Sequence, residues 1–505
     1  SGGMAGQYPC DNVDLLAHMP LNTIGGGNGN DIWGWTDPVT GKEYALAGRT
    51  NGTAFVDISD PENPVYVGNL DSHTGNSVWR DIKVHLDHAF IVSDLNGNHG
   101  VQVFDLTQLR DVTNPPVEFA ETAHYDDVGS AHNIAINEET GYAYAVGAQS
   151  CSGGLHMINI QNPTNPTFAG CFSSDGYTHD AQCVLYEGPD TTYTGHEICF
   201  AFNEDTVTIV DVTNKSNPDM LSRSPYAGSE YTHQGWITPD FERLLVDDEL
   251  DEQFNGHNTR TYIWDITNLD APDLINFFDS TAAAIDHNQY VHQGFAFQAN
   301  YRAGLRILDL SDIGNGNLSQ VGYFDIYPAN DSPSFNGAWS TYPYYESGVV
   351  VVQGIEQGLF VLQPQTGGGP ASLYGTGLRG ENEVPPVTTD ASGVAIFKPV
   401  AGDSALFFRL TVRDIPDITA AHIHCGAAGT NGPVGVTIPL SNPQPIPGGT
   451  RYQGVLTTPD GGNGCGWSTM ADVLAGLDSG DTYTNVHSST FPSGEIRGQN
   501  RVLVP

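Results

Sequence analysis

Short hydrophobic runs alternate with polar or glycine-rich turns along this chain, and one such run recurs through its first two thirds. Each copy starts at a glycine or polar residue, continues through mostly apolar residues, and ends at an Asp, Asn or Gln. Runs of this length, rich in β-branched and aromatic residues, predict β-strands rather than helices. The copies end 44 to 54 residues apart, at Asp57, Asp105, Asn159, Asp211, Asp265, Asp309 and Gln363.

Seven copies at this spacing predict an all-β fold, a seven-bladed β-propeller whose blades each contain four strands. The recurring acidic residue ends the third strand of a blade, where we expect it to cap a turn rather than to take part in chemistry. The seventh repeat lacks an outer strand of its own. We predict that residues 12–20 supply that strand, so that the two ends of the propeller close the ring and leave no open sheet edge.

The composition changes after the seventh repeat. Residues 365–371 are rich in Gly and Pro and predict a linker. Beyond it, residues 372–505 contain further alternating strands and predict a small β-sandwich. The chain thus divides into a lead-in at 1–11, the propeller at 12–364, the linker and this second domain.

The charge balance is strongly acidic, with 18 Lys and Arg against 59 Asp and Glu and a formal net charge of −41. This sign opposes binding to nucleic acid or to an anionic membrane and favours solubility in salt. No apolar run is long enough to span a membrane. We therefore expect a secreted or cell-surface protein from which a signal peptide has been removed.

Seven cysteines occur without any Cys-x-x-Cys motif, which argues against thiolate zinc, iron–sulfur clusters and attached haem. Disulfides suit a secreted protein, and three pairings fit the repeats and the second domain. Buried free thiols are the alternative. Cys10 is left over, either free or linked to another chain. The predicted disulfides are Cys151–Cys171, Cys183–Cys199 and Cys425–Cys465.

Aligning the predicted inner strands places one polar residue at the same position in each blade. Because side chains alternate along a strand, these residues should face the central channel near one of its mouths. Four are histidines, the commonest transition-metal ligands, so the ring predicts a site for Cu, Fe or Zn. The arginine and two asparagines would contact a bound ligand. Hydrogen bonding of each imidazole within a polar, water-filled mouth is the alternative. The ring is Asn30, Arg80, His132, His179, His233, His292 and Asn336.

The residues that follow this ring are polar in six blades. We expect them to lie between blades and to hydrogen-bond the neighbouring strand. Orientation of a metal-ligating histidine is a second role open to them. They are Asp31, Asp81, Asn133, Asp180, Gln234 and Gln293.

Two further sets of residues suggest metal sites. A run of acidic side chains at 247–252 offers the oxygen ligands that calcium prefers, although a solvated acidic face explains it equally well. In the second domain, two histidines flank one residue on a strand, and a third could join them as Cu or Zn ligands; we favour a hydrogen-bonded cluster there. The candidate calcium ligands are Asp247, Asp248, Glu249 and Asp251, and the second set is His422, His424 and His487.

Several motifs resemble known families. The LVIVD-type repeat, together with N-D-I-W-G-W at 30–35, Y-T-H-D-A-Q-C at 177–183 and D-D-E-L-D-E at 247–252, resembles the choice-of-anchor B family. The motifs G-E-N-E-V-P-P at 380–386 and A-H-I-H-C-G at 421–426 resemble a CHRD (chordin-type) domain. The first resemblance implies export and surface display without a settled activity. The second implies an accessory module for interaction or assembly.

No catalytic motif accompanies these features, because the chain lacks a G-x-S-x-G nucleophile elbow, a phosphate-cradling loop and a usefully placed dinucleotide fingerprint. We expect neither a nucleotide nor haem. The favoured function is a secreted binding, scaffold or assembly protein. Its propeller would bind a ligand or metal ion, and its tail would attach it to an extracellular protein, a polysaccharide or another copy of the chain. The alternative is an oxidoreductase-like metalloenzyme that uses the four channel histidines.

Overall fold

The structure is a computed structural model that describes residues 3–365, 373–389, 391–400, 405–441, 443–446 and 449–504. The chain divides into two compact units, and the boundary between them along the chain falls within the predicted linker. Most of this linker lies outside the described residues. Among the described residues, no helix is both long enough and apolar enough to cross a membrane.

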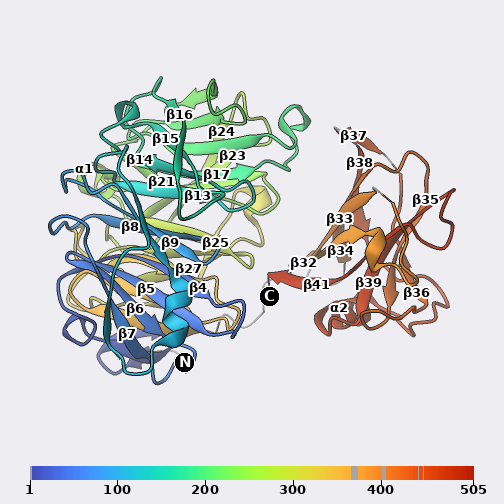
Figure 1. The fold of residues 1–505 in the computed structure, drawn as a ribbon, viewed down its shortest axis with the longest axis horizontal. Helices are drawn as coiled ribbons and strands as arrows, with labels where there is room; N and C mark the ends of the chain where they lie inside the picture. The colour runs from blue at the N-terminus through green and yellow to red at the C-terminus, as the bar shows by residue number, and fades with distance from the viewer. Residues whose placement is uncertain are drawn as a thin grey trace. The chain divides into compact units, whose positions relative to one another are not determined.

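The first unit is a seven-bladed β-propeller, as the repeat predicts. Each inner strand contacts the inner strands of the two neighbouring blades, from β4 round to β29 and back to β4. Figure 1 shows the blades in turn, from blue through green to yellow. The inner strands are β4 (Gly29–Thr36), β8 (Arg80–His85), β13 (Asn133–Asn137), β17 (Asp180–Leu185), β21 (Thr232–Ile237), β25 (Asn288–His292) and β29 (Ala338–Tyr342).

Two further antiparallel strands follow in each blade and form its buried middle. The second strands are β5 (Glu43–Arg49), β9 (His88–Ser93), β14 (Tyr142–Val146), β18 (Glu197–Phe202), β22 (Arg243–Asp248), β26 (Phe295–Ala299) and β30 (Val350–Gly354). The third strands are β6 (Gly52–Asp57), β10 (Val101–Asp105), β15 (Leu155–Asn159), β19 (Val207–Asp211), β23 (Arg260–Asp265), β27 (Leu305–Asp309) and β31 (Gly358–Pro364).

The outer strands complete the blades, and in the second blade the chain departs from the simple repeat. There the short strand β11 (Val117–Phe119) pairs in parallel with the outer strand of the first blade, and a later strand, β12, takes the outer position. The outer strands are β7 (Val65–Asp71), β12 (Ala123–Tyr125), β16 (Thr167–Phe172), β20 (Asp219–Ser224), β24 (Asp273–Asp279), β28 (Ser319–Phe324) and β3 (Val13–Met19).

The acidic residue that ends a third strand caps the turn after it, as predicted. Asp57 Oδ1 accepts the N–H of Ser59 at 3.0 Å, and Asp211 Oδ1 accepts the N–H of Thr213 at 2.9 Å. Each carboxylate satisfies a backbone donor where the strand ends and the chain turns towards the outer strand. The repeated Asp is therefore a structural signature of the blade.

The seventh blade takes its outer strand from the start of the chain, which confirms the predicted closure. β3 pairs antiparallel with β31, from Val13 opposite Pro364 to Met19 opposite Leu359. The preceding residues are more than a lead-in. β1 (Gly3–Ala5) and β2 (Tyr8–Asp11) form a hairpin that adds to β28 at the edge of the sixth blade. Cys10 is free and buried in this hairpin.

The three predicted disulfides are present. Cys151–Cys171 and Cys183–Cys199 each lie within one blade, and Cys425–Cys465 lies in the second unit. The few helical segments of the propeller are short; they are α1 (Asp251–Asn255) and the 3₁₀ turns η1 (Leu21–Thr23), η2 (Leu106–Asp111), η3 (Cys151–Gly153), η4 (Thr191–Tyr193) and η5 (Ile313–Asn315).

The second unit is a small β-domain in which ten strands form one curled, continuously hydrogen-bonded sheet. Its concave core contains Leu378, Phe397, Phe408 and Ile423, and the helix α2 packs Val473 against them. In chain order its elements are β32 (Leu373–Arg379), η6 (Gly380–Asn382), β33 (Ser392–Val400), β34 (Ala405–Arg413), β35 (Ile418–Cys425), β36 (Val434–Thr437), β37 (Gln444–Ile446), β38 (Gly449–Leu456), α2 (Met470–Asp478), β39 (Thr482–Ser488), β40 (Ile496–Gln499) and β41 (Arg501–Val504).

Removal of residues 1–19 is expected to open the ring. Without β3, the strand β31 loses its partner and the core side chains on both strands become exposed. We expect the melting temperature in calorimetry to fall by about 10 °C or more, because each large buried side chain contributes roughly 2–5 kcal/mol. The exposed edge should also promote self-association in size-exclusion chromatography. A chain lacking only residues 1–5 is the control, and equal stability of the two shortened chains would contradict the role of β3.

Candidate functional site

Four histidines at the start of four consecutive inner strands form a continuous series of neighbouring imidazole rings that are tilted against one another. We call His132, His179, His233 and His287 the imidazole column. Successive ring centroids lie 4.4, 4.0 and 4.4 Å apart. His179, His233 and His287 are buried, whereas His132 is partly exposed.

Hydrogen bonds orient three rings of the column. The Nδ1–H groups of His179 and His287 donate to the backbone carbonyls of His233 and Trp339, and that of His132 donates to Asp94 Oδ2 at 3.0 Å. A ring that donates through Nδ1 keeps its lone pair on Nε2, which is the usual arrangement of a metal-bound histidine. Burial lowers the pKa of His179 and His233 well below the ordinary value and lowers that of His287 to about 3, so these rings stay neutral.

One carboxylate joins the column at its buried end. Glu249 Oε1 lies 3.9 Å from His233 Nε2 and 3.7 Å from His287 Nε2, and it accepts the hydroxyl of Tyr301 at 2.7 Å. One ligand atom from each of His233, Glu249 and His287 lies within 4.8 Å of the others. Burial raises the pKa of Glu249 to about 7. We call these three residues the His–Glu–His triad.

The predicted ring of four histidines is corrected in the sixth blade, where the column takes His287 rather than His292. His179, His233 and His287 each lie at the entry to an inner strand, whereas His292 is the last residue of β25. There its ring packs on Tyr344 at 5.0 Å, and burial lowers its pKa to about 4. The misassignment arose because Tyr-x-His-Gln at 290–293 imitates the Tyr-Thr-His-Gln of the fifth blade.

The three other ring residues make contacts with the protein itself. Arg80 is buried and donates to the carbonyl of Arg49 and the hydroxyl of Ser72, and its Nη1 meets His99 Nε2 at 3.2 Å. The buried Asn30 donates to the carbonyl of Val78 at 3.2 Å.

Asn336, the last ring residue, connects Arg302 to Glu356. Its Oδ1 accepts from the guanidinium of Arg302, and its Nδ2 donates to Glu356 Oε1 at 2.6 Å.

The residues after the ring bind neighbouring blades at four of the six predicted positions. Asp31 and Asp81 accept the N–H groups of Ile82 and Ile134 at 3.0 and 2.7 Å. Asn133 and Gln234 donate to the carbonyls of His179 and Gln289, each at 3.0 Å. Two positions differ: Asp180 accepts the N–H of its neighbour Ala181, and Gln293 lies in the turn after β25.

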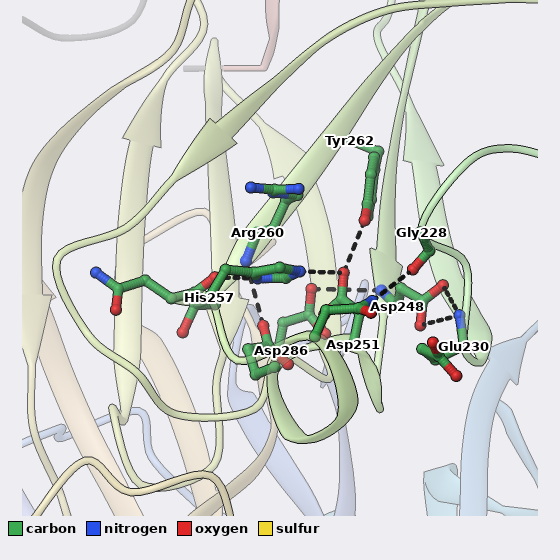
Figure 2. A network of polar contacts seen from close by, with 12 residues as sticks. Gly228, Glu230, Asp248, Asp251, His257, Arg260, Tyr262 and Asp286 are labelled. Atoms are coloured by element: carbon green, nitrogen blue, oxygen red, sulfur yellow. Dashed lines mark hydrogen bonds and ion pairs between the residues drawn. The ribbon is translucent and has the colours of Figure 1, made fainter.

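The acidic residues of the run at 247–252 have different partners. Figure 2 shows Asp248 and Asp251 with theirs. The two oxygens of Asp248 accept the N–H groups of Glu230 and Tyr231 and the hydroxyl of Tyr226, so this carboxylate holds the loop before β21. Glu249 belongs to the triad.

Asp247, Asp251 and Glu252 lie close together, and each is at most 2% exposed. Asp286, which the sequence did not single out, joins them from the loop before β25. Burial raises the pKa of Asp251 to about 7 and that of Glu252 to about 10.

The three histidines of the second unit form a hydrogen-bonded cluster, which sequence reasoning favoured. His422 Nδ1 lies 3.0 Å from His487 Nε2, and His487 Nδ1 donates to the carbonyl of Pro492. Both nitrogens of His424 have partners, the carbonyl of Gly432 and the side chain of Asn485. The ligand atoms are close enough to hold a metal, but the existing hydrogen bonds already satisfy most of them.

Protein-family models match segments of both units. The CHRD domain family matches residues 374–500, which span the curled sheet. The LVIVD repeat family matches residues 39–72, 128–173 and 198–224. These segments fall in the first, third and fourth blades. The chain carries LVIVD repeats and a C-terminal CHRD domain.

No curated protein matches the chain. Solved structures similar to the LVIVD–CHRD chain include a functionally unknown protein from Desulfotomaculum acetoxidans, with 14% identity, a TM-score of 0.42 and coverage of 61% of this chain and 88% of that one. The β-propeller domain of Cps50 (Swd1) from Myceliophteria thermophila has 11% identity and a TM-score of 0.43, covering 69% and 98%. A protein from Lactobacillus plantarum has 10% identity and a TM-score of 0.41, covering 74% and 93%.

Replacement of His99 by Gln is expected to make stability less sensitive to acid. His99 donates from Nδ1 to the carbonyl of Gly100, so Nε2 accepts from Arg80, and burial beside that cation lowers the pKa of His99 to about 3. The unfolded chain therefore takes up this proton first, near pH 6.5, and stability is lost as the pH falls from there towards 3. Melting temperatures measured between pH 7 and 4 should fall less steeply in His99→Gln. His88→Gln, at the first residue of β9, is the control; an unchanged slope in His99→Gln would contradict the assignment.

Proposed function

We propose that the protein is a secreted, surface-displayed scaffold whose His–Glu–His triad binds a transition-metal ion and whose CHRD domain attaches it to an extracellular partner. LVIVD repeats joined to a CHRD domain support a binding protein rather than an enzyme. Three disulfides and the net charge of −41 support an extracellular location. The motifs at 30–35 and 177–183 support membership of the choice-of-anchor B family.

The convergence of the triad on one point carries this proposal. His233, Glu249 and His287 come from the fifth blade and the start of the sixth, yet their ligand atoms lie within 4.8 Å of one another. The Nδ1 hydrogen bond of His287 leaves its Nε2 facing Glu249, and His233, which is 1% exposed, also presents Nε2 to this carboxylate. Two buried imidazole nitrogens and one carboxylate oxygen thus face one another, as the ligands of a single metal ion do.

The ligand set selects among metals. Two imidazoles and one carboxylate occur at zinc sites and at non-haem iron sites, whereas copper prefers a richer nitrogen or sulfur environment. We therefore expect Zn²⁺ or Fe²⁺. Three protein ligands leave at least one coordination position open. In a scaffold, that position would accept a carboxylate or imidazole from an extracellular protein, a polysaccharide or another copy of the chain.

The same open position favours one alternative, a metalloenzyme. A metal held by three ligands and a water molecule is the arrangement of catalytic rather than structural sites. Metal-dependent turnover of a defined substrate, lost in His233→Ala, would establish the alternative and replace the scaffold proposal.

Elemental analysis of the full chain, purified without chelator or affinity metal, tests the triad. We expect close to one Zn or Fe per chain. In His233→Ala the metal content should fall at least tenfold, because one of three ligands is lost. His132→Ala is the matched control, since His132 belongs to the imidazole column but lies outside the triad.

Absence of Zn and Fe from the wild-type chain, even after incubation with either ion, would refute the metal site. Retention of the metal in a folded His233→Ala would refute the ligand assignment. If His233→Ala does not fold, Glu249→Gln removes the negative ligand with almost no change in volume and gives the same test.

A further inference from the structure

A second set of buried carboxylates lies beside the His–Glu–His triad. One lies near the end of β22, two lie in α1 between β22 and β23, and the fourth belongs to the loop before β25 in the next blade. Their side chains are between 0% and 2% exposed. We call Asp247, Asp251, Glu252 and Asp286 the carboxylate cluster.

Each carboxylate in this cluster has one oxygen that accepts a hydrogen bond. Gln289 Nε2 donates to Asp247 at 2.7 Å, and the hydroxyl of Tyr262 donates to Asp251 at 2.8 Å. The backbone N–H groups of Arg260 and Asp248 donate to Glu252 and Asp286, at 3.2 and 3.4 Å.

The other oxygen of every member has no hydrogen-bond partner, although all four residues are more than nine-tenths buried. Asp286 comes from the loop before β25 in the next blade, and one of its oxygens lies within 4.8 Å of an oxygen of Asp251 and of Glu252. An unpaired, buried carboxylate oxygen is strongly unfavourable, and here four occur together. The oxygens without partners are Asp247 Oδ2, Asp251 Oδ1, Glu252 Oε2 and Asp286 Oδ1.

The surrounding basic side chains do not neutralise this charge. The guanidinium of Arg260 turns away to Asp279, with contacts of 2.7 and 3.1 Å. The imidazole of His257 approaches only Asp251, and Nε2 to Oδ2 is 3.5 Å. Figure 2 shows His257 and Tyr262 on either side of Asp251, with Asp286 nearby. Four carboxylates thus face one imidazole in this part of the described chain.

The spacing fits a single hard cation. One oxygen from each of Asp251, Glu252 and Asp286 lies within 4.8 Å of the others. Calcium–oxygen distances of about 2.3–2.6 Å place opposite ligands about 4.6–5.2 Å apart, so one Ca²⁺ reaches all three. Mg²⁺ needs shorter distances of about 2.0–2.1 Å and retains several waters. A site this deeply buried has little room for those waters, and calcium is favoured.

We propose that the carboxylate cluster is a calcium site that joins the fifth and sixth blades. The ligand set differs from the one that the sequence suggested. Asp248 accepts hydrogen bonds from the loop before β21, and Glu249 belongs to the triad, so Glu252 and Asp286 take their places. The bound ion orders the segment that carries Glu249 and the loop that carries His287, because Asp286 and His287 are adjacent. The proposal holds whether or not the triad binds a metal.

Calcium binding by the full chain tests the site. The protein is treated with EGTA, desalted, and titrated with CaCl₂ in an isothermal calorimeter at pH 7.5 and 0.15 M NaCl. We expect one tight site per chain and a higher melting temperature with calcium than with an equal concentration of MgCl₂. Asp286→Asn should weaken calcium binding at least tenfold and remove the calcium-dependent shift in melting temperature.

Asp286→Asn also distinguishes a role of Asp286 as a calcium ligand from a purely structural role. In EGTA it should be at least as stable as the wild type, because the substitution relieves the crowding of four buried carboxyl groups. A structural role alone would lower stability equally with and without calcium. Asp273→Asn, on the exposed strand β24, is the matched control for charge and should keep the full calcium response.

Three results would overturn the proposal: no calcium binding by the wild type, an equal response to magnesium, or an unchanged calcium affinity in Asp286→Asn. If Asp286→Asn does not fold, Glu252→Gln serves in its place. His233→Ala should keep its calcium response, so failure of the triad and failure of this site are distinguishable.

Discussion

The backbone of the inner strands sets the main constraint on this propeller. An inner strand is the edge of its own blade, so its outward N–H and C=O groups have no partner in the blade's sheet. Asp31, Asp81, Asn133 and Gln234 supply those partners by reaching across to the next inner strand. These side chains hold neighbouring blades in a fixed register around the channel. The contacts between successive rings of the imidazole column depend on that register, since each ring comes from a different blade.

The two aspartates among these side chains place negative charge inside the propeller, and this charge needs a positive partner. Lys83 does so for the first blades, where Nζ lies 2.6 Å from Asp81 and 3.9 Å from Asp31. Burial opposes its charge, yet these carboxylates raise the pKa of Lys83 and keep it protonated. The fifth and sixth blades have no corresponding lysine at Asp247 and Asp286. In that second region, the calcium ion that we propose would supply the balancing positive charge.

Much of the fold was predictable because its signals are local. The run that ends in Asp, the Gly and Pro turns and the outer strand missing from the seventh repeat all lie within short segments. The seven blades, the closing strand and the three disulfides followed from them. The site was less predictable, because its parts come together across blades. Asp286 is a lone acid in an unremarkable loop, and only its approach to Glu252 makes it a candidate ligand. The residues around His292 resemble the Tyr-Thr-His-Gln of the fifth blade more closely than those around His287 do, so the sequence alone favours His292.

The pairing of β3 with β31 determines when the propeller can close during synthesis of the chain. The two strands are neighbours in space, but about 350 residues separate them, and synthesis at about 5–20 residues per second delivers the second roughly 20–70 s after the first. Until then β3 has no partner and the ring stays open, however well the first six blades have formed. β31 is the last propeller strand to be synthesised, and it completes a blade whose outer strand, β3, is made near the start of the chain. A chain that ends before Pro364 leaves β3 without a complete partner strand, and this exposed segment is open to proteases and chaperones.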